Sequence, residues 1–278
     1  MTNFRPLYIF LAALAVITAY VVYDAKYNYV NWRTANRSSA GIAPSPLKEK
    51  EAVVQVYAAR TYNWRGYFAV HPWIAVKKKN ENFYTVYQVT AWNLYRGKSA
   101  VSIERDIPDR YWYGKRPQLL QTLKGEEAQK AIPAIEKAVR EYPFADRYQL
   151  WPGPNSNTFV AYVLREVPEL TVELPPTAIG KDFLGYTVFH APTPSGTGYQ
   201  VSILGAVSLI VGLKEGIELG LLGLSFGIDF YPPAVKLPIV GRIGFPTCNK
   251  KTIFFCGRLS VFEFPGQKTV RAIERTTA

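Results

Sequence analysis

A histidine in an apolar strand and a serine that opens a helix are the residues that could support chemistry. His71 lies within the strand-like run 66–76, and Ser156 lies between Asn155 and Asn157, before apolar residues at helical spacing. A hydroxyl at a helix N-terminus is close to the positive end of the helix dipole and to N–H groups that can stabilise an oxyanion. A histidine on a neighbouring strand could be its general base.

Both residues also have a purely structural interpretation, which the sequence leaves open. Asn155 or Ser156 could cap the helix, because Asn and Ser are preferred at that position. His71 could be a hydrogen-bonded core residue beside Trp73, and His190 is interpreted as a loop residue.

The sequence lacks the motifs of several enzyme classes. It contains no Gly-x4-Gly-Lys-Ser/Thr phosphate loop, no Gly-x-Gly-x-x-Gly after a strand and no His-Glu-x-x-His. The two histidines and two cysteines have no zinc-ligand spacing, so we expect no metal ion and no cofactor.

The composition indicates a globular protein that favours anionic partners. Of the 278 residues 48% are hydrophobic and 19% charged, which permits a sizeable core. Lys and Arg number 33 against 21 Asp and Glu, so the net charge is +12. Such a charge favours acidic lipid headgroups, nucleic acids or acidic polymers, but no nucleic-acid recognition motif is present and we expect no nucleic-acid partner.

The N-terminus predicts a membrane anchor. Leu7–Tyr23 is an uncharged run of 17 residues, which is near the lower limit for a transmembrane helix. A cleaved signal peptide is the alternative, but no convincing cleavage site comes after Tyr23. We therefore expect a short tail and anchor over residues 1–23. An N-terminal anchor usually translocates the chain on its C-terminal side, and the even cysteine count also suits an extracytoplasmic compartment.

Helical and strand-like patterns alternate after the anchor. Residues 24–51, with their Ser/Pro/Gly-rich stretch 38–46, are interpreted as a linker. The elements predicted next are strands at 53–57, 66–76 and 83–89, a helical region at 126–142 and a helix from Ser156 toward Pro168.

The C-terminal third predicts a β-hairpin over Tyr199–Tyr231. Two long apolar arms flank Lys214–Gly216, and the apolar face changes parity near 220–222, which suggests a bulge. Two membrane helices are the alternative, which Glu218 and Asp229 disfavour.

The C-terminal part of the sequence contains a pair of cysteines and a basic stretch. Cys248 and Cys256 could face each other across a hairpin, as a disulfide or as free thiols. Residues 234–278 hold eight Lys/Arg and two Glu, so their net charge is 8 − 2 = +6.

The order of the elements resembles the circularly permuted papain-like fold, in its lecithin:retinol acyltransferase-like and bacterial peptidase and amidase branches. In that family a His-Trp-x-Ile/Val strand precedes an Asn-Cys-x-x-Phe-Val helix. Here His71–Val76 (HPWIAV) resembles the first motif and Asn155–Tyr162 (NSNTFVAY) the second. Ser156 stands where the family has its nucleophilic cysteine, so the resemblance implies either a serine variant or an inactive site.

The same resemblance implies a role for each site residue. Ser156 would be the nucleophile and His71 the base, while Gln88, or alternatively Tyr87, would orient the histidine. The backbone N–H groups of Asn157 and Thr158 would form part of the oxyanion site. The expected binding residues are Asn155, Asn157, Thr158, Trp73 and Trp151.

The chain after the anchor also resembles an uncharacterised bacterial family of domains of unknown function, DUF3750, to which no activity is assigned. The resembling stretches are Trp32–Pro44, Val54–Val76, Trp151–Phe159, Leu174–Asp182, Pro194–Gln200 and Lys236–Gly244.

These observations predict an α+β protein of four parts. A transmembrane anchor (1–23) and a linker (24–51) precede a permuted papain-like antiparallel sheet with packed helices (52–190) and a basic extension with a Gly-rich β-hairpin (191–278). We expect a single-pass protein of the bacterial inner membrane, with its soluble domain in the periplasm and the lipid bilayer as a partner.

Three functions stay open, and the sequence does not decide whether the protein is an enzyme. The first is a Ser-His hydrolase or acyltransferase that acts on amide or ester bonds of envelope peptide, peptidoglycan or lipid. The second is a catalytically inactive envelope module that binds a peptide, glycan, lipid or partner subunit. The third is an assembly role in which the 199–231 hairpin pairs with a protein partner.

Overall fold

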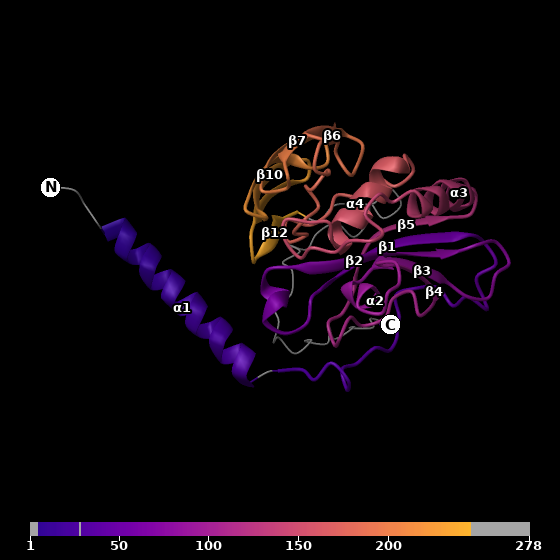
Figure 1. Cartoon of the computed structure of the whole chain (residues 1–278), viewed down its shortest axis with the longest axis horizontal. Helices are drawn as coiled ribbons and strands as arrows, with labels where there is room; N and C mark the ends of the chain where they lie inside the picture. The colour runs from indigo at the N-terminus through magenta and orange to yellow at the C-terminus, as the bar shows by residue number, and fades with distance from the viewer. Residues whose placement is uncertain (1–4, 28, 246–278) are drawn as a thin grey trace, which may run out of the picture.

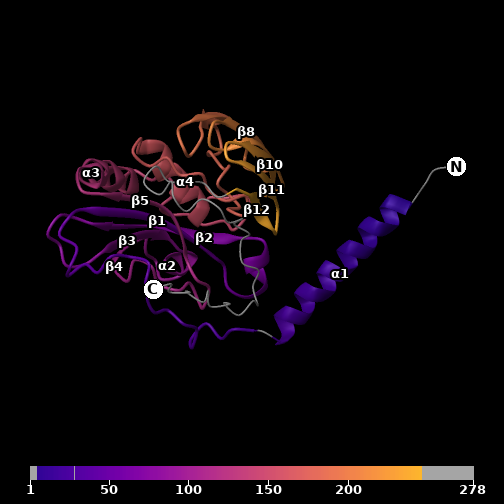
Figure 2. The ribbon, with the colours of Figure 1, turned by 180° about the vertical axis from the view of Figure 1, so that it is seen from behind.

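The computed structural model describes residues 5–27 and 29–245 (Figure 1). They form two antiparallel sheets, short helices that pack mainly on the first sheet, and a long N-terminal helix. Helix α1 (Arg5–Tyr27) projects away from the body, as the view from behind also shows (Figure 2). The arrangement confirms the predicted α+β class. No helix within the described residues is both long and apolar enough to cross a bilayer.

The first sheet has five strands in the order β4-β3-β2-β1-β5, all antiparallel. Helices α3 and α4 cover one of its faces, and α4 lies between this sheet and the second one (Figures 1 and 2). The predicted strand at 66–76 begins only at Val70, because the residues before it form the 3-10 turn η1. The elements of this half are β1 (Val53–Arg60), η1 (Asn63–Tyr67), β2 (Val70–Lys77), β3 (Thr85–Val89), α2 (Ala91–Leu94), β4 (Val101–Arg105), β5 (Gln118–Lys124), α3 (Glu126–Arg140) and α4 (Ser156–Glu166).

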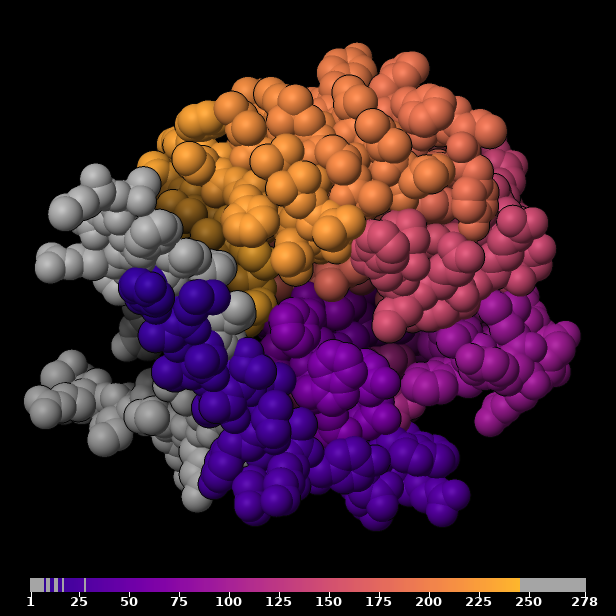
Figure 3. All heavy atoms as spheres, turned by 60° about the vertical axis from the view of Figure 1, so that its left-hand side comes forward, coloured from indigo at the N-terminus to yellow at the C-terminus, as the bar shows by residue number. Residues whose placement is uncertain are grey.

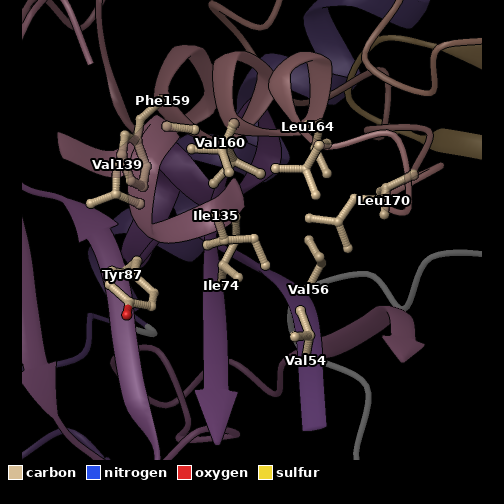
Figure 4. Close-up of a cluster of buried hydrophobic side chains, with 14 of the residues drawn as sticks. Val54, Val56, Ile74, Tyr87, Ile135, Val139, Phe159, Val160, Leu164 and Leu170 are labelled. Atoms are coloured by element: carbon tan, nitrogen blue, oxygen red, sulfur yellow. The ribbon is translucent and has the colours of Figure 1, made fainter. Parts of the chain in front are cut away.

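The main core lies between the first sheet and the helices α3 and α4. Side chains alternate between the faces of a strand, so Val56 and Ile74 point toward the helices. Figure 4 shows Val160 and Leu164 of α4, together with Ile135 of α3, packed above these strand residues. Each such side chain, when fully buried, contributes about 1.5–3 kcal/mol to folding.

The opposite face of the first sheet is covered by the segment expected to be a linker. Asp109, 1% exposed, accepts hydrogen bonds from the Ser39 hydroxyl (2.7 Å) and from the backbone N–H groups of Ile42 (2.5 Å) and Ala43 (3.1 Å). Ile42 thereby packs against a second buried cluster that includes Trp73. This part of residues 24–51 is thus joined to the domain by a buried carboxylate.

The second sheet has seven antiparallel strands in chain order. The single hairpin expected over 199–231 is wrong: each arm is itself a pair of strands. Leu222 and Gly223 have φ values of +51° and +80°, which is typical of a two-residue hairpin turn, so the change of parity expected as a bulge is a reversal of the chain. The strands are β6 (His190–Pro192), β7 (Gly198–Ile203), β8 (Val207–Gly212), β9 (Gly216–Leu221), β10 (Leu224–Phe230), β11 (Pro233–Leu237) and β12 (Gly241–Gly244).

Two predictions about the end of the chain are not tested by this fold. Cys248 and Cys256 lie outside the described residues, as does most of the basic stretch 234–278.

We predict that Asp109→Ala lowers the free energy of unfolding by about 3 kcal/mol, because hydrogen bonds to charged groups contribute roughly 1.5–3 kcal/mol each. Urea unfolding of the full chain in detergent, followed by tryptophan fluorescence, measures the loss. Limited proteolysis should also cut residues 38–46 more readily. The control is Asp146→Ala, since the Asp146 side chain is 76% exposed. Equal stability of the two variants would contradict the role given to Asp109.

Candidate functional site

The N-terminus of α4 is held by a capping box. Asn155 Oδ1 accepts hydrogen bonds from the backbone N–H groups of Asn157 (2.9 Å) and Thr158 (3.2 Å), and the Asn155 N–H donates to Thr158 Oγ1 (3.1 Å). Such a cap satisfies donors that a helix would otherwise leave unpaired. The two N–H groups expected to stabilise an oxyanion are therefore already bonded within the helix terminus.

Residues 179–180 form a second segment that lies against the N-terminus of α4. Asn155 and Asn157 both donate from Nδ2 to the carbonyl of Ile179, at 3.0 and 2.8 Å, and Thr158 Oγ1 donates to the carbonyl of Gly180 at 2.8 Å. Gly180 has φ +94°, and a Cβ there would lie 2.3 Å from the Asn155 amide nitrogen. Only glycine permits this close approach.

Ser156 is buried beneath this segment, with 4% of its surface exposed. Its side chain lies near the Tyr148 phenol. Burial raises the pKa of that phenol, and the interaction with Ser156 offsets part of the rise. Among the hydrogen bonds of the described residues, none joins Ser156 to His71.

The structure does bring His71 and Gln88 together. His71 Nε2 lies 3.0 Å from Gln88 Oε1. A carbonyl oxygen only accepts, so Nε2 donates and Nδ1 is the unprotonated nitrogen. The imidazole also stacks on Trp112, with ring centroids 3.7 Å apart and an interplanar angle of 7°.

The pleat of β2 places this pair on the face away from α4. Ile74 belongs to the cluster that α4 covers, whereas Trp73 belongs to the cluster on the other face. His71 shares the parity of Trp73 and lies against it, with ring centroids 6.1 Å apart. Tyr87, the alternative partner of the histidine, points into the cluster beneath α4.

The two predicted tryptophans lie in different surroundings. Trp73 is 2% exposed, and its indole N–H donates to the carbonyl of Pro108 at 2.7 Å. Trp151 is 48% exposed and lies beside Gly223, where a Cβ would come within 3.1 Å of its indole ring. Trp73 is thus a core residue, and Trp151 packs at a turn of the second sheet.

Burial controls the charge of His71. The loss of solvent lowers its pKa to about 4, although the bond to Gln88 acts in the opposite direction. The imidazole is therefore neutral at pH 7 and has the protonation state of a base.

A buried ion network in the second sheet was missed by the sequence interpretation. Lys181 Nζ pairs with Glu218 Oε2 at 2.6 Å, and Lys236 Nζ pairs with Glu218 Oε1 at 2.7 Å and Asp229 Oδ1 at 2.6 Å. Burial raises the pKa of nearby Glu173 to about 7, against the influence of Lys236. Alternation along the strands contained the clue, because Glu218, Asp229 and Lys236 share a parity opposite to that of the exposed apolar residues.

Within the described residues, no group of three or more His, Cys, Asp or Glu side chains is arranged so that it could hold a metal ion.

Comparison with known families adds one result. Residues 51–183 match the family model described as "Protein of unknown function (DUF3750)". The match contains the first sheet, α3, α4 and the segment around Gly180. It ends before the second sheet, so the resembling stretches at 32–44, 194–200 and 236–244 lie outside it. Neither the curated proteins nor the solved structures contain a match.

We predict that His71 makes stability depend on pH. Its pKa is about 4 when folded against a usual value of 6.5, so the unfolded chain binds the proton more tightly. This contribution is fully present above pH 6.5 and is lost as the pH falls toward 4. Between about pH 7 and pH 5 the loss should be about 2 kcal/mol.

Urea unfolding at both pH values, compared with His71→Gln, measures this contribution. The variant should lack that part of the pH dependence, whereas His190→Gln should keep it, because His190 is exposed. An identical pH dependence in His71→Gln and the parent protein would show that the histidine is not held neutral by burial.

Proposed function

We propose that the protein is a membrane-associated module of the bacterial envelope that binds its target without cleaving it. One observation carries this proposal: the N–H groups of Asn157 and Thr158 are both bonded to Asn155 Oδ1. An oxyanion site needs donors that are free and aimed at the reacting oxygen. Here the side chains of Asn155, Asn157 and Thr158 donate hydrogen bonds to the backbone of residues 179–180, so they hold two segments of the chain together.

The membrane association is proposed from the sequence. The uncharged run Leu7–Tyr23 supports an anchor at the inner membrane, with the remaining chain in the periplasm. The net charge of +12 supports contact with anionic headgroups.

A partly exposed aromatic cluster supports ligand binding on the face away from α4. We define it as His71, Trp92, Trp112 and Tyr113. Trp112 stacks on His71 and meets Tyr113 edge-on, with centroids 5.1 Å apart, while Trp92 is 47% exposed. Arg37 lies 4.6 Å from the centre of the Tyr113 ring. Aromatic faces with a nearby cation suit an envelope glycan or peptide.

A Ser-His hydrolase or acyltransferase is the second candidate. The bond between His71 and Gln88 favours it, because the permuted papain-like resemblance assigns those two residues as base and orienting partner. This function would require Ser156 to leave Tyr148 and reach the histidine, since a nucleophile and its base must come within about 3 Å.

We predict that a serine-directed fluorophosphonate does not label the full-length protein at Ser156. The hydroxyl is buried and lacks a bonded base, so its reactivity should equal that of an ordinary serine. Mass spectrometry of the treated protein measures labelling, with Ser156→Ala as the blank.

Labelling that Ser156→Ala abolishes, and that His71→Ala also abolishes, would overturn the binding proposal and establish the hydrolase. The second test is complementation of a strain that lacks the gene for this protein. The binding proposal is supported if Ser156→Ala restores the parent strain's growth and Trp92→Ala does not.

A further inference from the structure

The second sheet has an apolar outer face. We define the outer face as the exposed strand positions of β7–β10. Every one of these positions is apolar or aromatic. Its centre is formed by Val207, Leu209 and Val211 of β8 and by Ile217, Leu219 and Leu221 of β9, each 43–52% exposed. A contiguous apolar surface of this kind marks an interaction site.

The sheet cannot bury this face against its own domain. The opposite parity contains Glu218, Asp229 and Lys236, which are 0–2% exposed and paired in the buried ion network. A reversal of the sheet would bring the apolar residues inward only by breaking those pairs. The alternation of the sequence therefore fixes the apolar side chains outward.

We propose that the outer face docks on the surface of a lipid bilayer that contains anionic headgroups. This proposal rests on the membrane association proposed above and specifies the surface that makes it. The outward side chains of β8 and β9 have no hydrogen-bonding group, whereas protein interfaces typically contain about one hydrogen bond per 100–200 Å². Hydrocarbon requires no such partners, so it matches this surface better than another protein does.

Aromatic residues lie toward the ends of the strands. Tyr199 is 73% exposed in β7, and Tyr231, directly after β10, is 87% exposed. Tyrosine is enriched at the boundary between hydrocarbon and headgroups, because its ring is apolar and its hydroxyl stays hydrated.

The charge of the chain favours the same partner. In the sequence, residues 246–278 follow β12 and contain six Lys/Arg and two Glu. A basic stretch attached to the end of an apolar sheet adds attraction for anionic lipid.

Helix α1 is on the same side of the molecule as the outer face. Figure 3 shows both on the surface turned toward the viewer, with α1 in indigo and the second sheet in orange and yellow. Exposed α1 residues include Leu11, Val16 and Val22. One membrane could therefore contact both elements at once.

Flotation and lipid quenching test this proposal on the full chain. An environment-sensitive NBD fluorophore is attached at Leu209→Cys, in a background where Cys248 and Cys256 are Ser. Val201→Cys, a directly paired neighbour in β7, provides a second labelled variant in case one fails to fold. Glu104→Cys is the control, because Glu104 is an exposed strand residue of the first sheet.

The protein is reconstituted with vesicles of phosphatidylcholine and phosphatidylglycerol, with or without nitroxide-labelled lipid. We expect the fluorophore at Leu209 and Val201 to shift its emission to the blue and to be quenched several-fold more by the nitroxide than the fluorophore at Glu104.

The outcomes separate the two proposals. A protein that does not float with vesicles overturns the membrane association itself. A protein that floats but shows equal, weak quenching at all positions overturns only docking of the outer face. Shielding from an aqueous quencher without nitroxide quenching, together with a dimer on chemical cross-linking, would instead identify a second copy of the chain as the occupant and overturn the bilayer.

Discussion

Lys181 is a charged residue that is 3% exposed, and its ammonium group lies between Asp182, beside it in the chain, and Glu218 of the second sheet. Loss of Lys181 would leave the buried Asp182 carboxylate without its ion-pair partner, and breaking a buried pair in this way typically costs about 3–5 kcal/mol. The two residues directly before Lys181 give their carbonyl groups to the terminus of α4. Residues 179–182 thus connect the helix cap at one end with the ion network at the other.

This connection gives a structural role to the polar residues at the N-terminus of α4, among them Asn155. Asn155 uses its oxygen for two N–H groups of the helix and its nitrogen for the carbonyls of Leu150 and Ile179. The side chain of Asn155, which a papain-like site would direct at a substrate, is thus bonded to the chain itself. The sequence pattern of a catalytic helix terminus and that of a strong cap are the same, since both favour Asn and Ser before an apolar helix. Only the partners distinguish them.

The sequence predicted the parts of the fold that depend on local periodicity. The β-rich runs that predict β1 to β3 and the three-four spacing that predicts the helices each correspond to an element in the structure. The contact of His71 with Gln88 was implied by the permuted papain-like resemblance, with Tyr87 as the alternative, and the two residues lie on the neighbouring strands β2 and β3. The face on which His71 lies was not, since it depends on which side of the sheet α4 packs, and this is a long-range choice.

Other features depend on contacts or reversals that no local pattern reveals. Asp109 joins a segment 66–70 residues earlier in the chain, and nothing in the residues around it indicates that contact. The turn at Leu222–Gly223 resembles a bulge in the sequence, because apolar alternation shows which residues share a face but not where the chain reverses.

The second sheet reverses the usual relation between hydropathy and burial. In most antiparallel sheets that cover a core, the apolar face is buried and the polar face meets water. Here Glu218 and Lys236 are buried while their strand neighbours Leu219 and Val235 are exposed. Glu218 pairs with Lys236 at 2.7 Å and with Lys181 at 2.6 Å, so these buried charges are compensated by one another rather than by water. The free energy available from removing apolar surface from water is then left on the outside, where only a partner or a membrane can realise it.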